Sequence, residues 1–346
     1  QIDAGTQPTD ASARRAFDLQ ADAFGPGFDG PLVVVMQDRD GVKLADATQL
    51  ADAIGRDDAI AAVARPTRNE AGTVAVVQAF SRYAPHDERT AQLVDRIRDR
   101  VVPLTTTGNT RVLVTGSTAA NVDLADQMQQ RLPWIIGSVI AVSFVLLMIA
   151  FRSLLVPLKA ALMNVLSIGA GYGVVVAVFQ WGWGRDIVGL RETVPIVSWV
   201  PMLMWAILFG LSMDYEVFLI SSIRHAFRRH GDNRAAVVEG LGSTGRVITA
   251  AALIMLTVFG SFVAYPDPVV KMIGLGLAVA IFVDATVVRM LLVPATMTLL
   301  GRANWWLPRR LARVLPSVDL DSTETPERVA LVADGGERRE PVAIGS

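Results

Sequence analysis

The sequence predicts a polytopic α-helical membrane protein with five spans and an α+β domain outside the membrane. Of its 346 residues, 52% are hydrophobic, a share above that of most soluble domains. The hydrophobicity is uneven, because residues 1–130 have the composition of a soluble protein whereas residues 131–302 hold long uncharged runs. Residues 303–346 turn polar again, and we expect a cytoplasmic, largely disordered tail there.

Five apolar stretches are long enough to cross a bilayer, which takes about 20 residues of helix. They are residues 132–151, 156–181, 197–223, 247–265 and 269–300. The first and the fourth carry no charge, and the other three carry few. A charged residue inside a span is costly and usually functional, so these few charges are the candidate site residues.

The distribution of Lys and Arg predicts the orientation of the bundle. The loops on one side hold the larger basic set, namely Arg152, Lys159, Arg224, Arg228, Arg229, Arg234, Arg246, Arg302, Arg309, Arg310 and Arg313. The opposite loops hold only Arg185, Arg191 and Lys271. Because basic loops stay in the cytoplasm, we expect the C-terminus inside a bacterial plasma membrane and residues 1–130 outside it.

The region before the spans alternates between strand and helix patterns. Strand-like runs at 31–37, 59–64, 73–80 and 111–115 are separated by helical patterns at 45–55 and 86–101. The order β-α-β-β-α-β is that of a ferredoxin-like domain, also written βαβ-βαβ. We expect Leu93 and Ile97 to be buried against Val34 and Val76. Helical patterns also occur before this unit, at 11–24, and after it, at 118–131, where the helix is expected to run into the first span.

The composition excludes several functions. The chain has no cysteine, which excludes disulfides, thiolate metal sites and cysteine nucleophiles, and its three histidines have no partner at metal-ligand spacing. The net charge of −1 gives no electrostatic basis for nucleic-acid binding. No G-x-x-x-x-G-K-[ST] motif occurs, so nothing indicates ATP as an energy source. We therefore expect no cofactor and no enzymatic activity.

Two glycine patterns have structural interpretations. Gly240-Leu-Gly-Ser-Thr-Gly245 matches G-x-G-x-x-G but lacks the preceding strand that a dinucleotide site requires. We interpret it as a flexible cytoplasmic turn, with Arg246 at the membrane interface. Gly169 and Gly173, in the second span, have the spacing of a helix-packing contact.

Two spans carry acidic residues near the bilayer centre. Asp214, Tyr215 and Glu216 interrupt the third span, and Asp284 interrupts the fifth. Asp214 and Asp284 each lie about 15 residues into a span, so both are ~22–24 Å below the outer face. A carboxylate that binds and releases protons there, beside a tyrosine that donates a hydrogen bond to it, is what a proton relay requires. The alternative for both aspartates is a structural hydrogen bond or a helix-packing contact.

Helix geometry separates the remaining charges from these aspartates. Glu216 lies about 200° around the helix from Asp214, so the two do not face one cavity. We favour Asp214, with Tyr215 as its neighbour, as the residue that faces the cavity. The alternative for Glu216 is a position near a water-filled cytoplasmic vestibule. Arg289 lies about 140° around an α-helix from Asp284, so we do not expect it to sit over that residue. Arg289 is either part of the relay or a side chain that snorkels to the cytoplasmic interface.

Four segments carry a family resemblance: AFGPGFDGPLVVV at 23–35, FGLSMDYEVFLISSI at 209–223, GRVITAAALIM at 245–255 and GLGLAVAIFVDATVVRMLLVPATM at 274–297. They resemble the C-terminal half of MMPL proteins, which belong to the RND superfamily of proton-driven exporters of actinobacteria. The resemblance covers nearly all of residues 1–305. It implies twelve helices in two repeats, of which this chain supplies the second extracytoplasmic porter domain and helices eight to twelve. The chain begins with Gln1 and not Met, which also suggests a piece of a longer protein.

The resemblance implies roles for the charged residues. Asp214 and Tyr215 match the Asp-Tyr pair of the tenth helix, which faces an equivalent pair in the N-terminal half. Asp284 and Arg289 match a charged pair of the last helix. The implied function is secondary active, proton-driven export of lipids or other hydrophobic molecules, and the implied partners are the substrate, membrane lipids, the N-terminal half and further copies in a homo-oligomer.

Other functions on the same architecture are alternatives. They are efflux of drugs or small metabolites by the same mechanism, assistance to protein translocation as in SecDF, and sterol sensing without transport. Proton dependence separates the last from the exporters, because a sensor does not fail when the proton gradient collapses.

Overall fold

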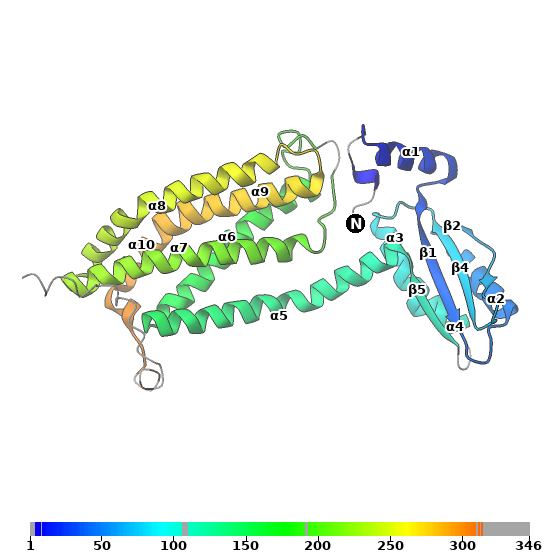
Figure 1. The fold of residues 1–346 in the computed structure, drawn as a ribbon, viewed down its shortest axis with the longest axis horizontal. Helices are drawn as coiled ribbons and strands as arrows, with labels where there is room; N and C mark the ends of the chain where they lie inside the picture. The colour runs from blue at the N-terminus through cyan, green and yellow to red at the C-terminus, as the bar shows by residue number, and fades with distance from the viewer. Residues whose placement is uncertain are drawn as a thin grey trace, which may run out of the picture.

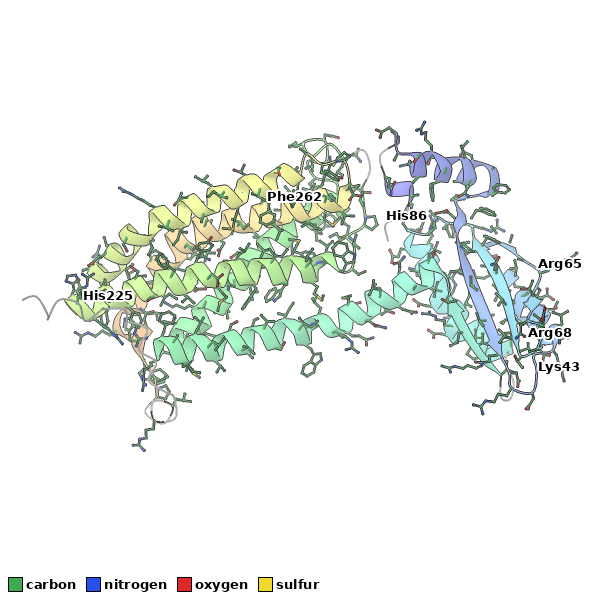
Figure 2. All side chains as sticks on the ribbon, in the orientation of Figure 1. Lys43, Arg65, Arg68, His86, His225 and Phe262 are labelled. Atoms are coloured by element: carbon green, nitrogen blue, oxygen red, sulfur yellow. The ribbon has the colours of Figure 1, made fainter. Side chains whose placement is uncertain are left out.

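The computed structural model describes residues 4–7, 9–105, 110–190, 193–308, 311 and 313. A sheet domain lies at one end and a bundle of helices at the other, and the long helix α5 joins them (Figure 1). Phe262 lies at the end of the bundle near the sheet domain, and His225 at the far end (Figure 2). Most of the tail for which disorder was expected lies outside the described residues.

The sheet domain follows the predicted order of strands and helices. After η1 (Ala4–Thr6) and α1 (Ser12–Phe24) come β1 (Gly27–Gln37), α2 (Leu44–Gly55), β2 (Ile60–Val63), β3 (Thr67–Arg68), β4 (Val74–Ser81), α3 (Glu88–Arg96), η2 (Ile97–Val101), α4 (Val102–Thr105) and β5 (Arg111–Thr115). The strand order is β2-β4-β1-β5, every neighbouring pair is antiparallel, and the two-residue β3 pairs with β4. Each βαβ unit is therefore split by a strand of the other, which confirms the ferredoxin-like prediction.

The core of the sheet domain confirms most of the predicted contacts. Leu93, Ile97 and Val34 are fully buried in one apolar cluster, where α2 and α3 cover one face of the sheet. The placement of Val76 in that core is wrong, because Val77 is the cross-strand partner of Val34 and is fully buried, whereas Val76 faces the other side and is only partly buried. Side chains alternate between faces along a strand, so a register error of one residue reverses the face.

Helix α5 (Ser117–Phe151) belongs to both parts of the molecule. At its start, Ala119 is fully buried in the core of the sheet domain, and Arg98 donates a 2.9 Å hydrogen bond to Asp123 of the helix. The helix then continues through Pro133 without a break into the bundle, where Phe151 is buried. The expectation that this helix runs directly into the first span is confirmed.

The described residues contain five helices long and apolar enough to cross a membrane, which confirms the predicted number. They are α5, α6 (Leu155–Val175) with η3 (Val176–Gln180), α7 (Val200–His230), α8 (Asn233–Phe262), and a last helix made of α9 (Pro268–Val283), η4 (Asp284–Leu292), α10 (Val293–Leu300) and the 3-10 turn η5 (Gly301–Trp305). The segments η3 and η4, like η2 in the sheet domain, are π-helical.

The interpretation of Gly240–Gly245 as a turn is wrong, because these residues lie inside α8. The turn comes earlier, at Gly231, whose φ of 70° suits glycine. Asp232 then caps α8 by accepting a hydrogen bond from the Arg234 amide. Gly240 has a packing role, since a Cβ there would lie 2.5 Å from a side-chain carbon of Ile223 on α7.

The packing role predicted for Gly169 and Gly173 is also wrong within this chain. A Cβ at either position would meet no atom within 4 Å. Gly171, between them, makes the close contact, because a Cβ there would lie 2.6 Å from the Gly276 carbonyl oxygen of α9. The glycine face that packs is therefore on the other side of α6.

Candidate functional site

A buried ion pair lies within the last helix. Arg289 Nη2 and Nε lie 2.7 and 2.9 Å from Asp284 Oδ2, and Arg289 is only 3% exposed. The expectation that Arg289 does not sit over Asp284 is wrong, since both residues belong to the π-helical segment η4. Its i→i+5 hydrogen bonding places residues five apart on adjacent turns, whereas the prediction assumed a regular α-helix. Snorkelling of Arg289 to the interface is excluded by the same contacts.

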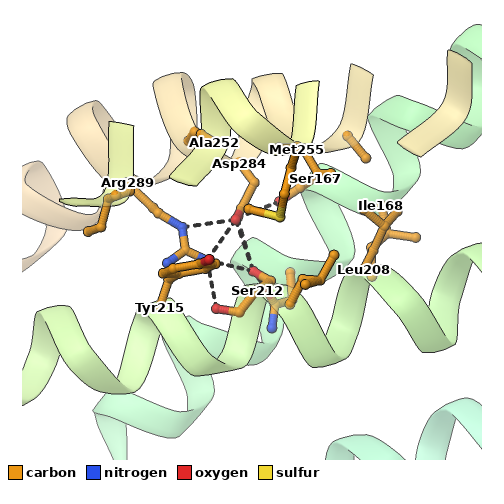
Figure 3. Close-up of a pocket in the computed structure, with 15 residues that line it drawn as sticks. Ser167, Ile168, Leu208, Ser212, Tyr215, Ala252, Met255, Asp284 and Arg289 are labelled. Carbon is orange, nitrogen blue, oxygen red and sulfur yellow. Dashed lines mark hydrogen bonds and ion pairs between the residues drawn. The ribbon is translucent and has the colours of Figure 1, made fainter. Parts of the chain in front are cut away.

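Two further helices hold this ion pair in place (Figure 3). Ser212 of α7 places its Oγ 3.1 Å from both carboxylate oxygens of Asp284. Arg289 Nη2 donates to the Ser212 carbonyl at 2.6 Å and lies 3.0 Å from its hydroxyl. From α6, Ser167 Oγ lies 3.2 Å from Asp284 Oδ1, and Asn164 accepts a hydrogen bond from Ser212. The charges are thus paired and hydrogen-bonded, as buried charges must be.

Tyr215 borders the same cluster. The Arg289 guanidinium carbon lies 5.5 Å from the centre of the Tyr215 ring, a cation–π distance. A cavity of about 20 Å³ adjoins them, with room for one water molecule (Figure 3). Arg289 Nη1 and Asn164 Nδ2 are buried and have no hydrogen-bond partner among the described residues. The cavity and these two unpaired donors together give this part of the bundle the size and the polar groups that a bound water molecule needs.

Asp214 does not join the cluster within this chain. Asp214 is exposed on α7, whereas Glu216 is only 6% exposed. The two face different directions, as predicted, but Glu216 and not Asp214 points into the bundle. Ala206, Gly210, Asp214 and Phe218 recur every fourth residue and are all exposed, so they form one uncovered stripe along α7. The role of Asp214 as a proton carrier stays a prediction.

The sequence analysis missed the hydrogen-bonding residues of the cluster. Asn164, Ser167 and Ser212 are buried polar residues in otherwise apolar spans. Such residues in neighbouring spans could have indicated the cluster from the sequence, because a buried amide or hydroxyl in a membrane needs a hydrogen-bond partner. Lys159, expected in a loop, lies in α6, and its Nζ donates a 2.8 Å hydrogen bond to Asn304 Oδ1.

A sheet domain carried on the first of five membrane-length helices, with a buried ion pair inside the bundle, defines an integral membrane protein with an intramembrane charged site. Comparison with known proteins gives the particular family. The model of the MMPL family matches residues 6–318, so the chain belongs to that family. Members of this family are transporters and not enzymes.

Three relatives illustrate the similarity. "Membrane protein YdfJ" of Bacillus subtilis is 36% identical over 98% of this chain and 46% of its own length. "Heme uptake protein MmpL11" of Mycobacterium tuberculosis is 40% identical over 87% of this chain and 31% of its own. "Mycolic acid-containing lipids exporter MmpL11" of Mycolicibacterium smegmatis is 37% identical over 89% and 33%. The chain thus spans less than half the length of these relatives.

Proposed function

We propose that this chain is the C-terminal half of a proton-driven exporter of lipids or other hydrophobic molecules, set in a bacterial plasma membrane with its sheet domain outside. The observation that supports the proposal most strongly is the buried Asp284–Arg289 pair bound by Ser212. Charges inside a bundle are expensive, and in membrane proteins they typically belong to ion or proton pathways. The Arg-rich far end of the bundle, marked by His225 in Figure 2, is then cytoplasmic.

The uncovered stripe on α7 supports the missing half as a partner. A carboxylate facing lipid at mid-membrane costs about 3 kcal/mol or more, so Asp214 needs a protein neighbour in the complete transporter. Ala206 and Gly210 on the same stripe are small and exposed, which permits close approach of another helix. The relatives have more than half of their length outside the region matched here, which is enough to supply that helix. Further copies in a homo-oligomer are a second proposed partner.

The two acidic sites are linked through Tyr215. Asp214 lies on the uncovered stripe, and its neighbour Tyr215 contacts Arg289 at the buried pair. We infer that binding of a proton at Asp214 changes the position of the neighbouring Tyr215 and, through its cation–π contact, the field at Arg289. Protonation is thereby connected to the packing of α7 against the last helix, which is the conformational change that a coupled exporter requires.

The cargo class follows from the relatives. One is named an exporter of mycolic acid-containing lipids and another a heme uptake protein. Both names refer to large molecules with extensive apolar surface, so we propose a hydrophobic cargo. Export is favoured by the lipid relative, and efflux of hydrophobic drugs by the same mechanism is the second candidate.

The test is export by the full-length protein carrying Asp214→Asn, reconstituted in proteoliposomes with and without a proton gradient. Asn is close in shape to Asp and cheaper to bury than a charge, so the variant inserts and folds but does not carry a proton. We expect loss of gradient-driven export. Asp267→Asn is the matched control, because Asp267 caps α9 by accepting a 2.8 Å hydrogen bond from the Val269 amide and Asn keeps that role. Export at the wild-type rate by Asp214→Asn would refute the proposed role of Asp214.

A further inference from the structure

One hydroxyl in the charged cluster has fewer protons to give than acceptors around it. Ser212 Oγ carries a single proton but faces three acceptors, namely both carboxylate oxygens of Asp284 at 3.1 Å and the amide oxygen of Asn164. Ser212 is also fixed in place, because Arg289 Nη2 donates to its carbonyl at 2.6 Å (Figure 3). Ser212 and Asn164 are both buried, so bulk water does not compete for the proton. The hydroxyl therefore donates fully to only one of these two neighbours at a time.

The two oxygens of the Asp284 carboxylate have different neighbours. Oδ2 accepts both hydrogen bonds from Arg289, at 2.7 and 2.9 Å. Oδ1 lies 3.1 Å from the hydroxyl of Ser212 and 3.2 Å from that of Ser167, and a hydroxyl can accept a hydrogen bond as well as donate one. A guanidinium only donates, so a proton on this carboxyl group fits at Oδ1 and not at Oδ2.

The two serines that touch Asp284 differ in their second acceptor. Ser167 Oγ also donates to the Met163 carbonyl at 2.8 Å, one turn earlier in α6, so its proton has an acceptor within its own helix in either state. The second acceptor of Ser212 lies on another helix, because Asn164 belongs to α6 and Ser212 to α7. Of these two hydroxyls, that of Ser212 therefore connects the last helix with the packing of α7 against α6.

Few other ionisable groups surround Asp284. Arg289 lies on its own helix, and α7 contributes Tyr215, which lines the cavity, and Glu216, which lies within electrostatic range. The described residues of α6 and α8 that line the cavity carry no titratable side chain. At the level of the cavity, α6 therefore meets Asp284 through neutral hydroxyl and amide groups.

We propose that Ser212 is a positioning residue whose hydroxyl turns with the protonation of Asp284 and so bonds α7 to α6 in one state only. With Asp284 ionised, the hydroxyl donates to the carboxylate, and the amide oxygen of Asn164 is left without that donor. When a proton binds at Oδ1, the new O–H group donates to Ser212 Oγ, and the hydroxyl turns its own proton to Asn164. No covalent bond of the protein breaks, and the proton is the one that drives the proposed export, so the inference rests on the proposed function. Proton binding thus strengthens the contact between α7 and α6.

The substitution Asp284→Asn mimics the protonated acid. Its amide oxygen faces Arg289, whose guanidinium only donates, so the NH2 group takes the place of the protonated Oδ1 and donates to Ser212. The experiment is a double-mutant cycle of Ser212→Ala and Asn164→Ala, measured by denaturant unfolding of the full-length protein in bicelles at alkaline pH, which keeps Asp284 ionised. The cycle is repeated in the Asp284→Asn background. We expect the coupling to change the unfolding equilibrium constant by less than about twofold with Asp284 present and by about fivefold in Asp284→Asn, the effect of one ordinary hydrogen bond.

Another pair of serines gives the matched control. The hydroxyls of Ser222 and Ser243 lie 2.9 Å apart between α7 and α8, and neither residue lines the cavity. The coupling of Ser222→Ala with Ser243→Ala should therefore be the same in both backgrounds. Ser212→Thr keeps the hydroxyl and should retain the coupling to Asn164. If Ser212→Ala does not fold, the cost of Asn164→Ala alone, compared between the two backgrounds, answers the same question.

Equal coupling of Ser212 and Asn164 in the two backgrounds would overturn the proposal. It is the result expected if the Asn164 amide lies the other way round and donates to Ser212 in both states. The measurement involves no transport, so failure of the proposed function gives a different result. Export at the wild-type rate by Asp214→Asn would refute the role of Asp214 and leave the coupling unchanged.

Discussion

Removing Arg289 alone from the Asp284–Arg289 pair should be far more damaging than removing both charges. Arg289 is 3% exposed and makes four contacts of 2.6–3.0 Å with Asp284 and Ser212. The substitution Arg289→Met leaves the Asp284 charge buried without its counter-ion, which typically costs 3–5 kcal/mol, here about 4 kcal/mol. Asp284→Asn alone leaves Arg289 uncompensated and should cost about 2 kcal/mol, because the amide oxygen still accepts a hydrogen bond.

The double variant supplies the decisive comparison. With both charges removed, the loss should be about 2 kcal/mol or less, well below the ~6 kcal/mol sum of the single effects, so the coupling energy is at least ~4 kcal/mol. The assay is denaturant-induced unfolding of the full-length protein in bicelles, at matched pH and protein concentration. Arg302→Met, at an exposed position, is the control and should change stability by less than about 0.5 kcal/mol. Additive single effects, or a stable Arg289→Met variant, would show that the two charges do not depend on each other.

Three other predictions concern the fold and its orientation. Gly240→Val should lower stability by about 1–3 kcal/mol in the same unfolding assay, because its Cβ would meet Ile223. Gly242→Ala has open space around it and should not lower stability. Equal effects of the two substitutions would contradict the close packing of α7 against α8. In the sheet domain, the hydrogen bond from Arg96 holds the pKa of Asp57 below its usual value. The Arg96–Asp57 pair therefore stabilises the fold above about pH 4, and this stabilisation is lost as the pH falls through the lowered pKa of Asp57. Arg96→Met should therefore lower the melting temperature at pH 7 by an amount equivalent to about 1 kcal/mol or less. If the melting temperatures of the variant and the wild type differed by the same amount in acid, the ion pair would not be the cause. A compartment reporter inserted in the sheet domain should be active outside the cytoplasm and one placed after the last span inside it, and two reporters in the same compartment would refute the proposed topology.

Periodicity and composition predicted the architecture because both reflect bulk properties of each segment. The number of spans, the continuous helix from the sheet domain into the bundle and the split βαβ order all follow from long patterns, in which a few atypical residues do not matter. Val76 shows the limit of this reasoning. Its pattern gave the correct strand, but the face depends on a register that only the pairing of Val34 with Val77 determines.

The candidate site was predicted by residue type and missed in its geometry. A charge within a span is conspicuous, so Asp214, Glu216, Asp284 and Arg289 were all identified from the sequence. Their contacts depend on a local departure from α-helical geometry, the π-helical segment η4, which no periodicity in the sequence indicates.

The surroundings of Asp214 were predicted only through the family resemblance. Within the described residues Asp214 is exposed on α7, and its expected partner in the N-terminal half stays a prediction. Lys159 was counted among the basic loop residues. Its actual partner, Asn304, lies 145 residues away in the chain, beyond the range of any local pattern.

The central claim, that protons drive movement of a hydrophobic molecule through this protein, is tested most directly by measuring both fluxes together. Full-length protein in proteoliposomes would be loaded with a fluorescent lipid analogue and a pH indicator, and an inward proton gradient would be imposed. The account predicts that lipid efflux and proton influx start together, stop together when the gradient is collapsed, and are both absent in Asp214→Asn. Lipid movement that continues unchanged after collapse of the gradient would contradict it.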